Sequence, residues 1–153
     1  MKEHIPYTDS IVFAAEYMVR ACREYAKKAI KDNNLPLNYE EYLILDVVCA
    51  NPGLIQMEIA KKIFMQRSYL SKLLTALEEQ NYIKREQSIK GKRQVVMSIY
   101  ITKQGEKICS EMKNVFRNQI LKKILIDHSK MEKVKDELFE IGDKLVQTFN
   151  LKL

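Results

Sequence analysis

The chain has 153 residues, of which 46% are hydrophobic, and carries a formal net charge of +6 at pH 7. This length fits a single domain, and the hydrophobic content is sufficient for a packed core, which argues against wholesale disorder. Only four Gly and three Pro interrupt the chain, so we expect long helices rather than many short strands joined by tight turns.

Missing patterns argue against several functional classes. Residues 1–6 hold no apolar segment behind a basic start, and no apolar run reaches the ~18 residues of a membrane span. The three Cys are far apart, without a Cys-x-x-Cys pair, so we predict neither a zinc site nor disulfides, and a reducing, cytoplasmic setting fits best. No nucleotide-binding motif occurs, and neither His4 nor His128 has catalytic partners. We therefore expect no metal, no cofactor, no membrane contact and no enzymatic activity.

The net charge is concentrated in one segment. Residues 61–93 hold nine Lys and Arg against three Glu, which equals the net charge of the whole chain, so the remaining residues are neutral together. A concentrated positive charge indicates an anionic partner for this segment.

The hydrophobic pattern first predicts two helices. One covers residues 9–31 and ends before Pro36; its apolar stripe is too wide for a helix buried on one side only. The other begins at a capping box formed by Asn38 and Glu41. Its apolar face is expected to hold Tyr42, Leu45, Val48 and Cys49.

A turn at 51–53 leads to a short third helix at 56–63 and a fourth helix at 67–80. The fourth helix has apolar residues at i, i+3, i+4 and i+7, and Asn81 follows it at the position of a left-handed cap. These apolar residues are Leu70, Leu73, Leu74 and Leu77.

Beyond residue 83 the period changes. Alternation over 94–102, paired with 83–88, predicts a β-hairpin about Gly91 with a basic tip. The helical period returns after Thr102, the expected N-cap of a helix that runs to about residue 126. A last helix follows with a heptad-like apolar seam. The seam consists of Met131, Val134, Leu138, Ile141, Leu145 and Phe149.

Two short helices joined by a turn and followed by a basic hairpin form a winged helix-turn-helix. The fourth helix would enter the major groove of DNA, and the hairpin would follow the backbone or enter the minor groove, whose negative potential attracts Arg and Lys. Because the leucines point inward, the other side chains of the helix are left for bases or phosphates. The expected DNA-binding residues are Arg67, Ser68, Tyr69, Ser71, Lys72 and Thr75 on the helix, and Lys90, Lys92 and Arg93 at the hairpin tip.

Each of these assignments has a structural alternative. Ser68 would serve equally as a helix cap, and Lys61 and Lys62 as solvated surface. Lys84 and Arg85 would serve as strand-edge charges that deter aggregation. The structural alternative is weaker for the tip cluster, because its like charges repel one another and gain nothing structurally from their proximity.

The segment 37–105 resembles the MarR (multiple antibiotic resistance regulator) family of dimeric winged-helix transcription factors. The similarity lies in the order and spacing of several short motifs. These are residues 37–42, the Ile-Ala-x-x-Ile of 59–63, the recognition-helix stretch 65–73, the Leu-Glu-x-x-Asn-Tyr-Ile of 77–83 and the Ile-Thr-Lys-Gln-Gly of 101–105.

Two positions depart from the family pattern. Arg93 matches the Arg of the family's Asp-x-Arg wing motif, but Gly91 replaces the Asp, so the salt bridge that braces the wing is absent. Ile55 stands where a Ser or Thr cap is common, so we expect the third helix to start less well anchored.

The resemblance implies a mainly α fold with a small β-wing. In one unit of residues 1–153, a winged helix-turn-helix at 37–102 would be flanked by dimerisation helices at 9–32 and 103–150. It also implies a homodimer that binds a pseudo-palindromic double-stranded operator as a repressor, released by a small-molecule effector or an oxidant. Some relatives sense oxidants through a Cys on the first helix, the position of Cys22, although apolar neighbours favour a buried, unreactive thiol there.

Two other functions stay open on the sequence. A winged-helix interaction module would bind an acidic protein through the basic face, without sequence-specific DNA binding. An enzyme would need a site, and none is visible.

Overall fold

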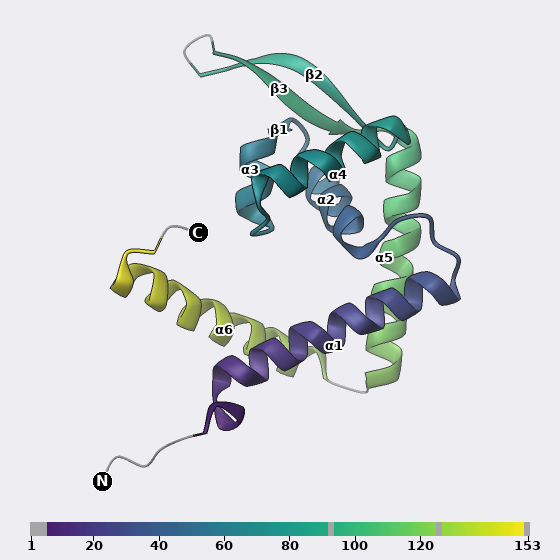
Figure 1. Ribbon diagram of the computed structural model, residues 1–153. Coiled ribbons are helices and arrows are strands. Elements are labelled where there is room, and N and C mark those ends of the chain that lie inside the picture. The colour runs from purple at the N-terminus through teal and green to yellow at the C-terminus, as the bar shows by residue number, and fades with distance from the viewer. Residues whose placement is uncertain (1–5, 92–93, 125–126, 152–153) are drawn as a thin grey trace.

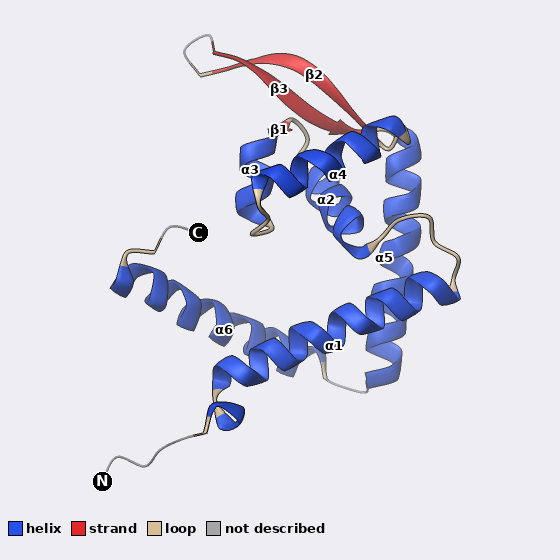
Figure 2. Ribbon diagram, in the orientation of Figure 1, coloured by secondary structure: helices blue, strands red, loops and turns tan. Residues whose placement is uncertain are grey.

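The computed structural model describes residues 6–91, 94–124 and 127–151, and the side chains of these residues apart from 117–124 and 128. Helices dominate the described chain, and a small sheet lies at one end of the molecule (Figures 1 and 2). The elements in chain order are the 3-10 turn η1 (Tyr7–Asp9), α1 (Ile11–Asp32), α2 (Tyr39–Ala50), β1 (Leu54–Ile55), α3 (Gln56–Lys62), α4 (Arg67–Glu79), β2 (Ile83–Lys90), β3 (Gln94–Ile101), α5 (Lys103–Ile124) and α6 (His128–Phe149).

Local capping chemistry determines where the helices begin and end. The predicted capping box of α2 is confirmed, because Glu41 N–H donates to Asn38 Oδ1 at 2.8 Å and Asn38 N–H donates to Glu41 Oε2 at 2.9 Å. After α4, Asn81 adopts the predicted left-handed conformation with φ of +59°. The first helix starts slightly later than predicted, because Ser10 caps it by accepting the Phe13 N–H at 3.2 Å.

The sheet has the order β1-β3-β2 and is antiparallel throughout. The predicted hairpin is confirmed, with Ile83 opposite Ile101 at its base and Lys90 opposite Gln94 near its turn. The sequence did not indicate β1. Its two residues are too few to show alternation, and only pairing with Ser98 and Ile99 makes them a strand.

The core lies where α2, α4, β3 and α5 meet. All four predicted leucines of α4 are at most 8% exposed, and Ile44, Leu45 and Val48 of α2 are fully buried. Cys49 is exposed, so its predicted place on the apolar face of α2 is wrong. It lies about 90° around the helix from the centre of that face, at 100° per residue.

Helix α6 begins near the lower end of α5, and α1 crosses α5 and lies along α6, at the end of the molecule opposite the sheet (Figure 1). Of the described side chains of α1, only Ala26 and Ala29 are buried. The predicted seam of α6 is largely exposed, from 38% at Met131 to 66% at Phe149. The two helices line an open groove of about 620 Å³. Their hydrophobic faces are therefore only partly covered within one chain. None of the described helices is long and apolar enough to cross a membrane.

Gly105, in the first turn of α5, lies against the end of α4. A Cβ at this position would be 2.0 Å from the Tyr82 carbonyl oxygen and 2.8 Å from Ile101 Cγ1. The same carbonyl accepts the Thr102 N–H at 3.0 Å, and the Thr102 hydroxyl accepts the Gly105 N–H at 3.0 Å. The Thr-x-x-Gly pattern therefore joins α5 to the segment that follows the recognition helix.

Gly105→Ala is expected to destabilise the fold by about 2–3 kcal/mol, because the clash is with backbone and cannot be relieved by a side-chain rotation. Urea unfolding followed by circular dichroism measures the loss. Lys107→Ala, at an exposed position of the same helix, should change the free energy of unfolding by less than about 0.5 kcal/mol. Equal stability of the two variants would contradict the close contact.

Candidate nucleic-acid interface

The turn between α3 and α4 sets the angle at which α4 is presented. Phe64 has a φ of +52°, and the Met65 N–H donates to the Ala60 carbonyl at 3.0 Å. Gln56 Nε2 donates to the Arg67 carbonyl at 3.0 Å and so ties the start of α3 to the start of α4. The cap of α4 is Gln66, without a side-chain bond, and Ser68 lies inside the helix. The interpretation of Ser68 as a helix cap is therefore wrong.

The side chains predicted to contact DNA lie on the uncovered side of α4. Arg67, Ser68, Tyr69, Lys72 and Thr75 are exposed, and Ser71 is half-buried. The Thr75 hydroxyl already has two partners, because it donates to the Ser71 carbonyl at 3.0 Å and accepts from Arg85 Nη2 at 3.2 Å. Thr75 thus joins the recognition helix to the wing, and a DNA contact would have to share its hydroxyl.

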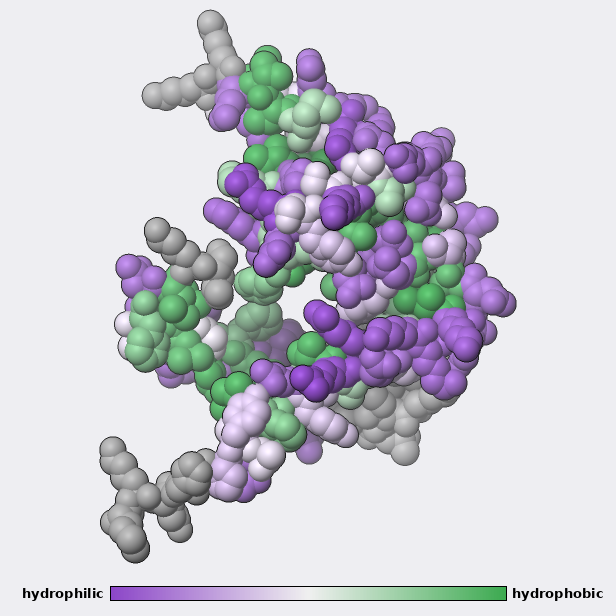
Figure 3. Space-filling view, in the orientation of Figure 1, coloured by the Kyte–Doolittle hydropathy of each residue, from purple (hydrophilic) through white to green (hydrophobic). Residues whose placement is uncertain are grey.

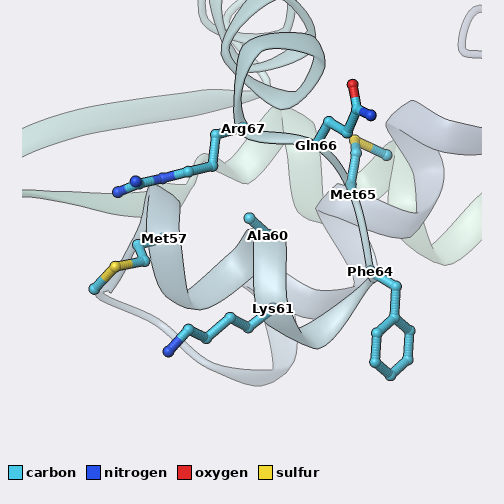
Figure 4. A pocket seen from close by; sticks show the side chains of 7 residues that line it. All are labelled: Met57, Ala60, Lys61, Phe64, Met65, Gln66 and Arg67. Atoms are coloured by element: carbon cyan, nitrogen blue, oxygen red, sulfur yellow. The ribbon is translucent and has the colours of Figure 1, made fainter. Parts of the chain in front are cut away.

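A shallow hollow of about 410 Å³ lies beside the start of α4. Figure 4 shows Met57, Lys61 and Arg67 extending to one side of it, while Phe64 points the other way. Lys61 of α3 and Arg67 of α4 thereby extend to the same side of this hollow, beside the N-terminal end of the recognition helix.

The base of the wing is joined to the C-terminal half of α4. Arg85 Nε lies 3.3 Å from Glu78 Oε2, and the Arg85 N–H donates to Glu78 Oε1 at 3.2 Å. With the Thr75 contact, these bonds fix Arg85 on the helix. Arg85 thus makes specific tertiary contacts, beyond the edge-charge role that the sequence left open.

The outer part of the wing is joined to α3. Lys90 Nζ lies 2.7 Å from Glu58 Oε2, and the same oxygen accepts the Ile55 N–H at 2.8 Å. This carboxylate corrects two expectations. The wing is braced by a salt bridge after all, from Glu58 rather than from an Asp at position 91. The start of α3 is also anchored, because Glu58 accepts the Ile55 N–H although Ile55 itself has no capping side chain. Sequence reasoning missed Glu58, although a Glu three residues after a helix cap was the available signal. Lys92 and Arg93 lie outside the described residues.

The ion pairs show which cations of the basic segment are left for a ligand. Lys84 pairs with Glu86 at 2.6 Å, and Arg85 and Lys90 pair as above. Among the described residues of 61–91, the cations without an ion pair are Lys61, Lys62, Arg67 and Lys72. The unneutralised charge thus lies on α3 and α4.

The cysteines differ in environment. Cys22 is exposed, so its expected burial is wrong, because none of the described residues covers that side of α1. Cys109 is buried, and burial raises the pKa of its thiol to about 11, with smaller contributions from Asp46 and Cys49. Cys109 is therefore protonated and unreactive at neutral pH. Within the described residues, no three His, Cys, Asp or Glu side chains are grouped to hold a metal ion.

The family model for the MarR family matches residues 35–94, which span α2, the helix-turn-helix and β2, and end at the first residue of β3. The winged-helix region is thus similar to the MarR family. No curated protein sequence matches the chain. Solved structures match nearly its whole length, so the flanking helices share the fold of these structures.

Three of these structures illustrate the likeness. The transcriptional regulator SlyA is 23% identical, with a TM-score of 0.69 over 92% of this chain and 98% of that one. A complex of MepR from S. aureus with DNA is 18% identical, with a TM-score of 0.73 over 92% and 99%. CouR from Rhodococcus jostii RHA1 bound to p-coumaroyl-CoA is 18% identical, with a TM-score of 0.74 over 90% and 95%. At these identities the likeness concerns the fold.

The Glu58 carboxylate offers a direct measure of the wing brace. Its pKa lies below the ordinary 4.5, because Lys90 and then the Ile55 N–H donate to it. The contribution of the brace to stability is thus fully present above pH 4.5 and lost as the pH falls through the lowered value. Lys90→Gln should raise the pKa of Glu58 toward 4.5 in a carboxyl NMR titration. Lys61→Gln, on the same helix as Glu58, should leave the pKa of Glu58 unchanged. A raised pKa of Glu58 in that variant would show that the shift comes from the positive charge of the whole segment and not from the Lys90 ion pair.

Proposed function

We propose that the protein is a dimeric, sequence-specific regulator that binds double-stranded DNA and represses transcription by occupying its operator. One observation carries this proposal. The exposed hydroxyls and unpaired cations of α4 lie beside a wing that ion pairs fix to both helices of the motif. Such side chains hydrogen-bond base edges and phosphates. The MepR structure, which contains DNA, supports the same use of this fold.

The hydrophobic faces of α1 and α6 support a homodimer. Ile11 and Val12 of α1 are both 55% exposed, and Leu145 of α6 is 49% exposed. A contiguous exposed apolar surface of this kind marks an interaction site. A second copy would cover it symmetrically and set two α4 helices to read half-sites about one DNA turn apart.

For release from DNA we propose a small-molecule effector. A cavity of about 630 Å³ lies between α1 and the start of α2. Its lining includes Arg20, Arg23 and the ring of Tyr39, which suit an anionic aromatic compound. Lys27 pairs with Glu24 at 2.6 Å in the same lining, which also holds Glu40. CouR holds p-coumaroyl-CoA. A ligand that binds better to one spacing of the two winged domains would shift the population toward it. Oxidation of exposed Cys22 is the second route to release.

A module that binds an acidic protein is the alternative. The exposed hydroxyl of Ser68 beside Arg67 favours DNA over an acidic surface, because the two side chains can hydrogen-bond base edges and phosphates. The two functions differ in one property: only the first selects particular duplex sequences from a random pool.

A selected duplex should bind with an affinity that falls steeply with salt, because phosphate counterions are released. Lys72→Ala should lower the slope of log K against log [salt] by about 1. Fluorescence anisotropy from 50 to 300 mM NaCl (about the range over which such affinities collapse) measures the slope. Lys28→Ala, at a cation of α1, is the control with an unchanged slope. Equal binding to all duplexes by the wild-type chain would refute the proposal.

Ile141→Glu should dissociate the dimer, because it places a charge in the apolar seam of α6. Sedimentation equilibrium should give twice the 18.0 kDa of one chain for the wild type and a single chain for the variant. Gln147→Glu adds the same charge to an exposed position of α6 outside the seam and should remain dimeric. A monomeric wild type at micromolar concentration would count against the assembly.

A further inference from the structure

The outer half of the wing carries an uncovered hydrophobic face. Ile89 is 71% exposed, Val95 64% and Met97 47%. Ile89 is directly opposite Val95 in the hairpin register, and Met97 is two residues further along the same strand. Because side chains alternate between faces of a strand, all three share one face of the hairpin. At the base of the hairpin this face belongs to the core, where Ile83 and Ile99 are at most 2% exposed.

We propose that this apolar face of the wing packs against the deoxyribose rings that form the walls of the DNA minor groove. The proposal rests on the proposed DNA-binding function and adds a second kind of contact to it. The recognition helix and the cations would supply charge and hydrogen bonds. Ile89, Val95 and Met97 would supply affinity that salt does not weaken.

The surroundings of the face favour DNA as its occupant. Lys90, next to Ile89 in the strand, projects to the opposite face of the hairpin and is held there by Glu58. Lys90 is thus kept off the apolar side of the wing. In the view of Figure 3 hydrophobic side chains of the hairpin are visible from the same side as α4 in Figure 1. Arg85 lies on this apolar face, four residues before Ile89, and donates to the Thr75 hydroxyl of α4. The face therefore continues into the surface proposed to read the major groove.

The size of the face also argues against a protein partner. Three side chains offer far less than the roughly 800 Å² per partner that a stable protein interface buries. A minor groove, by contrast, accepts a few apolar side chains of an architectural protein beside its cationic contacts.

The two kinds of contact differ in their response to salt. Counterion release depends on the number of phosphates neutralised and sets the slope of log K against log [salt]. An apolar contact with sugars releases no counterions, so its loss lowers the affinity equally at every salt concentration. Loss of the apolar contact therefore gives a plot of log K against log [salt] that is parallel to that of the wild type. Loss of a phosphate contact gives a plot with a shallower slope.

The test compares three full-length variants with the wild type on one selected duplex, by anisotropy across the same salt range. Ile89→Thr with Val95→Thr keeps β-branched residues in the strands but removes apolar surface. It should bind about tenfold more weakly at each salt concentration, with the wild-type slope. Ile89→Val with Val95→Ile keeps the surface apolar and should bind within about twofold of the wild type. Lys72→Ala gives the reference for a changed slope.

Each outcome decides the proposal. Wild-type affinity in the threonine variant, with its circular dichroism spectrum unchanged, would overturn the DNA contact and leave the face to another occupant. A shallower slope like that of Lys72→Ala would also overturn it, because the loss would then be electrostatic. If the threonine pair fails to fold, Val95→Thr alone, which is nearly isosteric, takes its place with an expected loss of about threefold. If the wild-type protein selects no duplex, the DNA-binding function itself is refuted. If the wild-type protein selects a duplex and the threonine variant binds it equally well, only the wing contact is refuted.

Discussion

Burial of the leucine face of α4 is the constraint on which the rest of the winged-helix region depends. Leu70, Leu74 and Leu77 are completely buried, and Leu73 nearly so. Removing four leucine side chains from water is worth several kcal/mol, so α4 cannot rotate about its axis without losing much of the stability of the domain. The side chains between the leucines are consequently held outward. Burial of one face thus determines which groups the other face presents.

The wing is held by polar contacts rather than by a core of its own. Arg85 joins its base to Glu78 of α4, and Lys90 joins its outer half to Glu58 of α3. Exposed ion pairs contribute little to stability, typically below about 1 kcal/mol each. Their effect here is geometric, because together they fix the hairpin relative to both helices of the motif. These ion pairs also neutralise Arg85 and Lys90, so neither side chain adds to the positive charge available to a ligand.

The net positive charge and the largest hydrophobic surface are separated along the molecule. Among the described residues of 61–91 the unpaired cations lie on α3 and α4, whereas the large uncovered apolar faces lie on α1 and α6. This separation suits a protein that meets an anion at one end and a second copy of itself at the other. The effector cavity proposed between α1 and α2 lies where the two ends join, so a ligand there would act on the angle between them.

The sequence by itself determined the α-helices of the described chain, the hairpin and the inward face of α4, because these follow from periodicity and from caps that act over three or four residues. It also located the positive charge. Tertiary structure decided what depends on residues distant in the chain: the strand β1, the exposure of Cys22 and Cys49, and the partners of Lys90 and Thr75. Glu58 and Lys90 are 32 residues apart, and no local pattern connects them. A period shows which residues share a face, but only packing shows whether that face meets the core, another molecule or solvent.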